Sequence, residues 1–174
     1  MGKPNLNVVI DGQFAQQSYQ ESKDMAEKGN MPAAADRMDQ TQHFLGRALQ
    51  EAGINPNDPK HAEDGFKFLG TTAEQWKEDY QSTQILAAQQ QMEKAADPKT
   101  APQKAYEALV DAQQRMEKAG FADNSAAGLK LLGTDEKSVN QLMSDKYEAL
   151  TLELAEQKVA PQGPKVQAPG AAQP

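Results

Sequence analysis

The sequence predicts an all-α fold in which helical hairpins carry an internal two-fold repeat. Good helix formers (Gln, Ala, Glu, Lys and Met) dominate the chain, while the β-branched residues that favour strands are scarce. A six-residue motif, G-[FL]-K-[FL]-L-G, occurs twice, at residues 65–70 and 128–133. Each copy follows a helical pattern that ends in Ala-Gly, and each is followed by Thr and a further helical pattern.

The length and composition of the chain exclude several classes of protein. A chain of 174 residues is long enough for one domain with a real core, and with only 6% aromatic residues that core must consist mainly of Leu, Ala and Met. A net charge of −7 argues against nucleic-acid binding, and the absence of Cys excludes disulfides and thiolate catalysis. No apolar run approaches the ~18–20 residues that span a membrane, so we expect no membrane insertion. The expected compartment is the cytoplasm, with leaderless secretion or a virion as alternatives.

The first part of the chain predicts a short arm followed by two helices. Residues 1–12 form the arm, whose apolar run at 8–10 is interpreted as a brief extended segment or a docked coil. The first helix covers about residues 13–28 and stops at Gly29-Asn30. The second covers 31–52, with Asn30 as its cap, Pro32 in its first turn and Gly53 at its end.

A short helix and a third long helix follow. Asp58 and Pro59 start the short helix, which ends near Leu69. Thr71 and Glu74 have the spacing of a capping box, so the third long helix is expected to start there and to run to about residue 96.

The second half predicts the same order of elements. Thr100 and Gln103 form another capping-box spacing before a helix that runs to Ala119. A second short helix ends at Gly133, and its predicted caps are Asp123, Asn124 or Ser125. The last helix, 134–158, has the clearest apolar face of the chain, at Val139, Leu142, Met143, Tyr147, Leu150 and Leu154.

These correspondences predict a duplication. Repeat one covers about residues 13–70 and repeat two about 71–133, and the helix at 134–158 seals the exposed end of repeat two. Together the three make a single helical domain at 13–158. Residues 159–174 are rich in Pro, Gly and Ala, and are predicted to be a disordered tail.

Catalytic, cofactor and metal sites are not predicted. The two histidines, His43 and His61, have no Glu or His at helical ligand spacing, and no phosphate loop, nucleotide fingerprint or nucleophile elbow occurs. The numerous carboxylates are better explained as solvated helix faces than as a catalytic pair.

Four aromatic residues are the candidates for contact with a protein partner: Trp76, Tyr80, Phe66 and Phe68. Trp and Tyr dominate binding hot spots, and Trp76 and Tyr80 lie one helical turn apart. The competing interpretation, which the sequence favours, is that Trp76 and Tyr80 cover the neighbouring helical hairpin as part of the core.

The resulting hypothesis is a non-enzymatic protein that binds another protein, as an adaptor, a chaperone-like partner or a component of a larger assembly. A first alternative is a secreted or injected bacterial effector or a virion-associated protein, because a chain without Cys and with few aromatics suits unfolding for transport. A second alternative is a helical enzyme that uses carboxylates alone.

Overall fold

The computed structural model describes residues 5–159, and all regular structure in that range is α-helical, as the sequence predicts. The helices are α1 (Leu6–Glu27), α2 (Met31–Glu51), α3 (Pro59–Phe68), α4 (Ala73–Ala96), α5 (Pro102–Lys118), α6 (Ala126–Leu131) and α7 (Glu136–Val159). The predicted disordered tail lies outside the described residues, apart from position 159 at the end of α7.

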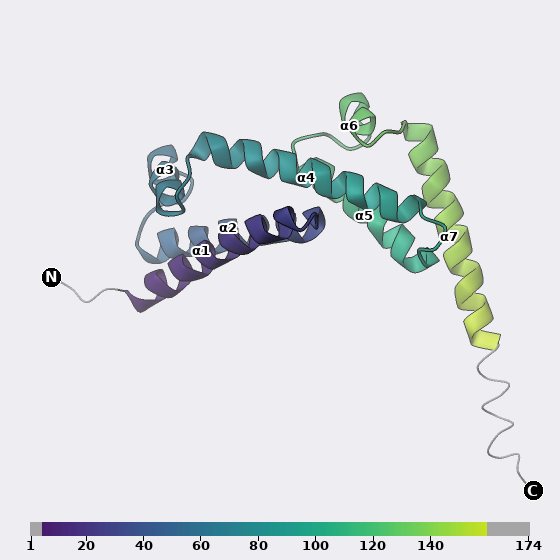
Figure 1. Ribbon diagram of the computed structural model, residues 1–174, viewed down its shortest axis with the longest axis horizontal. Helices are drawn as coiled ribbons and strands as arrows, with labels where there is room; N and C mark the ends of the chain where they lie inside the picture. The colour runs from purple at the N-terminus through teal and green to yellow at the C-terminus, as the bar shows by residue number, and fades with distance from the viewer. Residues whose placement is uncertain (1–4, 160–174) are drawn as a thin grey trace, which may run out of the picture.

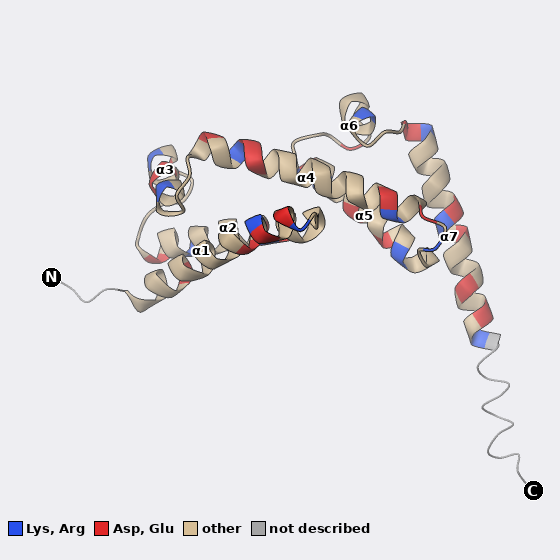
Figure 2. Ribbon diagram, in the orientation of Figure 1, with Lys and Arg blue, Asp and Glu red and all other residues tan. Residues whose placement is uncertain are grey.

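The helices form an elongated row rather than a closed bundle (Figure 1). α1 and α2 make one antiparallel hairpin, and α4 and α5 make a second. α4 also packs against α2, and α7 packs against α5, so each long helix joins one group of helices to the next. α3 and α6 lie at the outside of the first and second hairpins, and acidic and basic residues are interspersed along most helices (Figure 2).

The predicted arm at residues 1–12 is wrong from Leu6 onward, because α1 already begins there. Asn5 caps the helix by accepting a hydrogen bond from the Asn7 backbone N–H (3.0 Å). The Asn5 side chain also donates to the Glu51 carbonyl at the end of α2 (3.2 Å). These bonds start α1 before the apolar run at 8–10, which is helical although its residues favour strands.

The two predicted stops at Gly53 and Gly120 are confirmed. Both glycines adopt positive φ, +77° and +94°, a conformation that costs side-chain-bearing residues energy. The next residue then folds back: the Ile54 N–H donates to the Leu49 carbonyl (2.8 Å), and the Phe121 N–H to the Met116 carbonyl (3.0 Å). This is the Schellman pattern, with the expected apolar residue after the glycine.

Both predicted capping boxes are wrong, for different reasons. The Thr71 N–H already closes the end of α3 by donating to the Phe66 carbonyl, so Thr72 caps α4 instead. Before α5 the cap position falls on Ala101, because Pro102 at the first helical position forces the residue before it to be extended. Ala101 offers no side-chain acceptor, and Thr100 does not cap the helix.

The core consists of three clusters along the row. The first, beneath α3, contains Ala15, Tyr19, Met38, Leu45, Leu69 and Trp76. The other two join α4 to α5 and α7 and rest mainly on alanines, with Met116 and Leu109 as their large buried members. Both halves thus place a helical hairpin, a short helix and the start of the next long helix in the same order, which supports the duplication but leaves it a prediction.

Candidate partner-binding groove

An apolar groove of about 510 Å³ lies at the N-terminal end of the molecule, between α1, α2 and α3. Its walls come from three segments that are distant in the sequence. The lining residues are Val8, Val9, Gly12, Gln13, Gln16, Leu45, Ala48, Leu49, Ala52, Ile54, Asp64, Gly65 and Phe68. Because most of these side chains are apolar, the groove suits another apolar surface.

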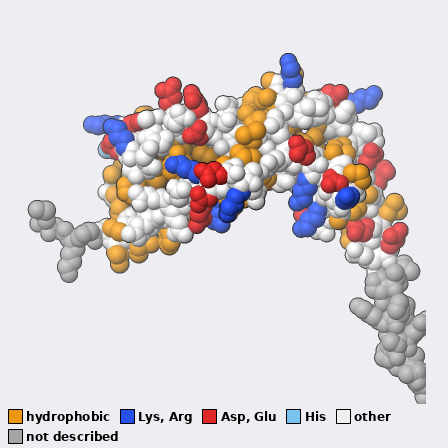
Figure 3. All heavy atoms as spheres, in the orientation of Figure 1, with side chains coloured by type: hydrophobic (Ala, Val, Ile, Leu, Met, Phe, Trp, Pro, Cys, Tyr) orange, Lys and Arg blue, Asp and Glu red, His pale blue; other side chains and the backbone are white. Residues whose placement is uncertain are grey.

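Four apolar side chains of α1 are exposed, and one of them, Val9, lines the groove. Leu6, Val9, Ile10 and Phe14 are 67%, 44%, 37% and 45% exposed. Leu6, Ile10 and Phe14 are spaced by four residues and share one side of the helix, and Val9 lies between that side and the groove. Figure 3 shows hydrophobic side chains gathered along the part of the molecule where α1 lies. Exposed apolar residues that are contiguous in this way are typical of interaction surfaces.

Two glycines bring α3 close to the hairpin. A Cβ at Gly65 would lie 3.2 Å from Leu45 Cδ2, so the absence of a side chain lets α3 approach α2. A Cβ at Gly12 would lie 3.3 Å from Phe68 Cζ, which places the Phe68 ring over α1. Phe68 remains 49% exposed there, and its ring forms one edge of the groove.

A glutamine fixes the end of each short helix to its hairpin. The Gln16 side chain donates to the Phe68 carbonyl at the end of α3 (3.4 Å), and the Gln89 side chain donates to the Leu131 carbonyl at the end of α6 (2.8 Å). Phe68 and Leu131 hold the same position in the two copies of the six-residue motif. The two glutamines therefore mark corresponding places on α1 and α4.

This correspondence sets Gly12 of α1 against Ile85 of α4. Four residues before Gln16 is Gly12, and four residues before Gln89 is Ile85. Ile85 packs against the cluster of Ala112 and Met116 and covers its own hairpin. Gly12 has no side chain to do the same, and the ring of Phe68 from α3 occupies the space over it instead.

The four predicted contact residues separate into three core residues and one groove residue. Trp76 is 3% exposed and lies in the first cluster, stacked on Phe66 at a centroid distance of 5.4 Å. Phe66 and Tyr80 are partly buried against the same cluster. Only Phe68, of the four, lies on the groove. The apolar run at 8–10 is helical in the structure, and it was the sequence signal for the wall of the groove that α1 supplies.

A network of polar side chains connects α2 of the first hairpin to α4 and α5 of the second. Arg115 of α5 is 4% exposed and donates to Asp111 Oδ2 (2.6 Å), Asp36 Oδ1 of α2 (2.8 Å) and Gln84 Oε1 of α4 (3.3 Å). Burial lowers the pKa of the Arg115 guanidinium, but the bonds to Asp36 and Asp111 outweigh it and hold the pKa above its ordinary value. The network links α2, α4 and α5 at one guanidinium and so connects the two hairpins.

Tyr80 belongs to a second polar contact between the hairpins. Its hydroxyl donates to Asp39 Oδ1 (2.7 Å), and Asp39 Oδ2 accepts from Lys118 Nζ (2.8 Å). Burial, and then the hydrogen bond to Asp39, raises the pKa of the Tyr80 hydroxyl well above its ordinary value. Tyr80 therefore stays neutral and bridges α4 to α2.

The histidines and carboxylates do not converge in the described part of the chain. Within residues 5–159, no group of three or more His, Cys, Asp or Glu side chains is arranged to hold a metal ion. His43 is exposed on α2 with its ring near Phe44, and His61 lies on α3. None of the helices described is both long and apolar enough to cross a membrane.

Comparisons with known proteins identified no similar protein. No family model, no curated protein and no solved structure matches the chain.

Proposed function

We propose that the chain is a non-enzymatic interaction protein whose groove between α1, α2 and α3 receives an apolar helix face from another protein. The observation that carries this proposal is the apolar lining of the groove, at which Val9 of α1 is 44% exposed and Phe68 of α3 is 49% exposed. A helix that lies in a hydrophobic groove, anchored by a few apolar side chains, is a common mode of recognition.

The second half of the molecule indicates the chemistry of this occupant. There, Ile85 presents a branched aliphatic side chain to the corresponding surface. A partner helix would supply such a side chain to the groove between Phe68 and the end of α2. The net charge of −7 favours a partner with a basic surface, and Asp64 at the groove lies where such a charge would meet it.

The test compares a groove variant with a matched variant elsewhere. Val9→Asp places a charge in the groove on a residue that is 44% exposed, so the fold should tolerate it. Leu152→Asp makes an equivalent change on α7, at a side chain that is 65% exposed and does not line the groove. Circular dichroism should show the same helix content for both variants and the parent protein.

Proteins captured from cell extract by the parent chain would be identified by mass spectrometry, purified, and titrated against all three chains by calorimetry. We expect Val9→Asp to weaken binding of the true partner by at least about tenfold, because burying an unpaired charge is costly. Leu152→Asp should leave the affinity unchanged. Equal affinity for Val9→Asp and the parent chain would refute the groove as the docking site.

A further inference from the structure

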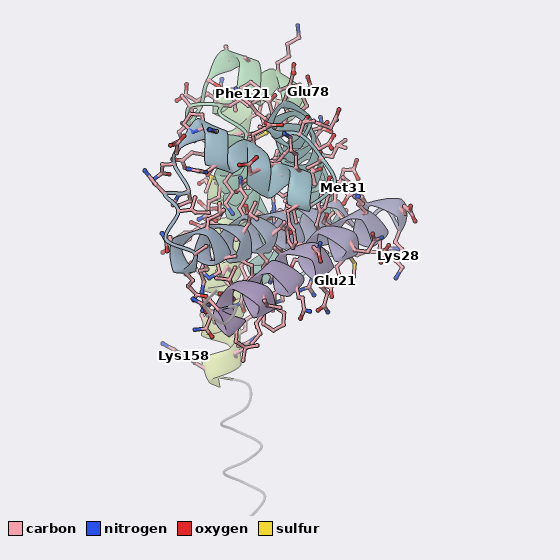
Figure 4. The ribbon with its side chains drawn as sticks, turned by 90° about the vertical axis from the view of Figure 1, so that its left-hand side faces the viewer. Glu21, Lys28, Met31, Glu78, Phe121 and Lys158 are labelled. Carbon is pink, nitrogen blue, oxygen red and sulfur yellow. The ribbon has the colours of Figure 1, made fainter. Side chains whose placement is uncertain are left out.

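A second apolar surface lies at the opposite end of the molecule, on α7. The N-terminal turns of α7 are packed: Val139 is 2% exposed, and Leu142 and Met143 contact the cluster of Leu109. Further along the helix, Tyr147 is 60% exposed and Leu154 is 49% exposed. The last turns project beyond the other helices (Figure 1), and Lys158 lies at the far end of the view from Phe121 (Figure 4).

The apolar residues of α7 form one continuous stripe. Met143, Tyr147, Leu150 and Leu154 are spaced by four, three and four residues. This spacing keeps them on one face and is the pattern by which two helices pair along a seam. The stripe begins inside the contact with the second hairpin, where the Tyr147 ring lies 6.0 Å from the ring of Tyr106 of α5, and it continues past this contact to Leu154.

The corresponding face of α4 shows what covers such a stripe. Counting from Gly65 and Gly128, three residues of α4 correspond to three residues of α7. The pairs are Gln84 with Tyr147, Ala87 with Leu150, and Gln91 with Leu154. In α4 this face lies under the antiparallel helix α5: Gln84 and Ala87 are fully buried, and Gln91 donates to Asp111. Among the described residues, no helix takes the place of α5 on α7.

We propose that a second copy of the chain covers this face, its α7 pairing antiparallel with the first about a two-fold axis. In such a pair the second α7 runs antiparallel to the first, just as α5 runs antiparallel to α4. It also covers the stripe of both copies with one interface, as an isologous dimer requires.

The charges beside the stripe favour the antiparallel direction. Lys146 and Glu153 flank the same side of it. In the register that sets Tyr147 against Leu150 of the second copy, Lys146 lies beside Glu153 of the second copy, and the symmetry produces this ion pair twice. A parallel pair would bring Lys146 beside uncharged Thr151 of the second copy.

This self-association does not depend on the groove, which lies at the other end of the chain. The paired stretch is short, so we expect a weak dimer at the small end of specific interfaces. Sedimentation equilibrium between about 5 µM and about 500 µM spans the range in which such a dimer forms. A chain that stays monomeric throughout this range would overturn the proposal.

The first pair of variants tests the face. Leu154→Asp puts a charge into the stripe and should raise the dimer dissociation constant at least about tenfold. Leu152→Asp is the matched control, because a separation of two residues places Leu152 on the other side of α7 and leaves it outside the stripe. A dimer that Leu154→Asp does not weaken, or that Leu152→Asp weakens equally, would overturn the assignment.

The second set tests the direction of pairing. Lys146→Glu or Glu153→Lys alone turns both ion pairs into like-charge pairs, and each should weaken the dimer by about tenfold. The double variant Lys146→Glu/Glu153→Lys restores opposite charges and should recover the parent dissociation constant. Failure of the double variant to recover would overturn the antiparallel register, whereas the groove proposal would stand or fall on its own titration.

Discussion

The first and second halves of the molecule hold corresponding positions with very different side chains. Trp76 and Val139 each lie eleven residues after the first glycine of the repeated motif, and they are 3% and 2% exposed. Around Trp76 gather the rings of Tyr19, Phe66 and Tyr80. Beside Val139 a small cavity of about 20 Å³ remains, and Phe121 is the one aromatic residue of its lining.

The difference shows which features of this architecture are fixed and which vary. Glycine turns, the short helix and the glutamine bond to its end recur in both halves. The side chains that fill the space beneath the short helix do not recur, because aromatic rings in one half stand where Val, Leu and Met stand in the other. The same order of helices therefore accommodates two cores of different volume. We expect the stability of the aromatic half to depend more strongly on a single residue.

The largest expected effect is at this central position. Trp76→Ala should lower the free energy of unfolding by about 3–5 kcal/mol, since it removes a large buried ring and leaves a cavity. Val139→Ala removes far less volume and should cost only about 2 kcal/mol. Urea unfolding followed by far-ultraviolet circular dichroism measures both, and equal losses would mean that the two halves do not differ as their cores suggest.

A smaller contrast is expected at the last leucine of each motif. Leu69 is 8% exposed and Leu69→Ala should cost about 2–5 kcal/mol, whereas Leu132 is only half-buried and should cost less, about 1–2 kcal/mol. The exposed Lys67 and Lys130 provide controls in the same short helices. Their Ala variants should stay within about 0.5 kcal/mol of the parent chain. A stronger loss at Leu132 than at Leu69 would contradict this order.

The smallest effect concerns pH and Tyr80, which has an apolar counterpart, Met143, in α7. The folded chain holds the Tyr80 proton more tightly than the unfolded chain, because burial and Asp39 raise its pKa above 10.0. Its contribution is therefore complete below about pH 10 and is lost as the pH rises further. Tyr80→Phe should reduce the fall in stability between about pH 10 and 11 by less than about 1.4 kcal/mol.

Tyr147→Phe is the control for this measurement, because Tyr147 is 60% exposed on α7. Thermal unfolding of the three chains across the alkaline range would show the difference as a change in slope. Equal slopes of stability against pH for Tyr80→Phe and Tyr147→Phe would mean that the contact with Asp39 does not raise the pKa of the Tyr80 hydroxyl.

Most of the helices could be predicted because their signals are local. Asp58 with Pro59, Ser125, and the glycines at 53 and 120 each act on their own turn of backbone, and each does so as expected. The start of α1 could not be predicted, because its cap residue Asn5 is held by a hydrogen bond to the Glu51 carbonyl of α2, a contact distant in sequence. Thr71 also misled, since the preceding helix had already used its N–H.

The candidate groove could be predicted only in part. Phe68 was recognisable as an aromatic residue in a repeated motif, but its exposure depends on Gly12 lying beneath its ring. Trp76 has the same chemical appeal in the sequence and is buried, because Tyr19 and Phe66 close around it. Which aromatic residue reaches solvent is decided by contacts between segments, and no local pattern encodes them.

The single helix α4 has a consequence for how the molecule unfolds. Its first turns complete the aromatic cluster through Trp76, and its later turns supply Ala88 and Ala95 to the other two clusters. If either hairpin separates from α4, then α4 loses part of the packing that holds it in the other hairpin. Amide hydrogens in the middle of α4 should therefore exchange with solvent only in the rare excursions that unfold the whole chain, while those near the end of α7 exchange first.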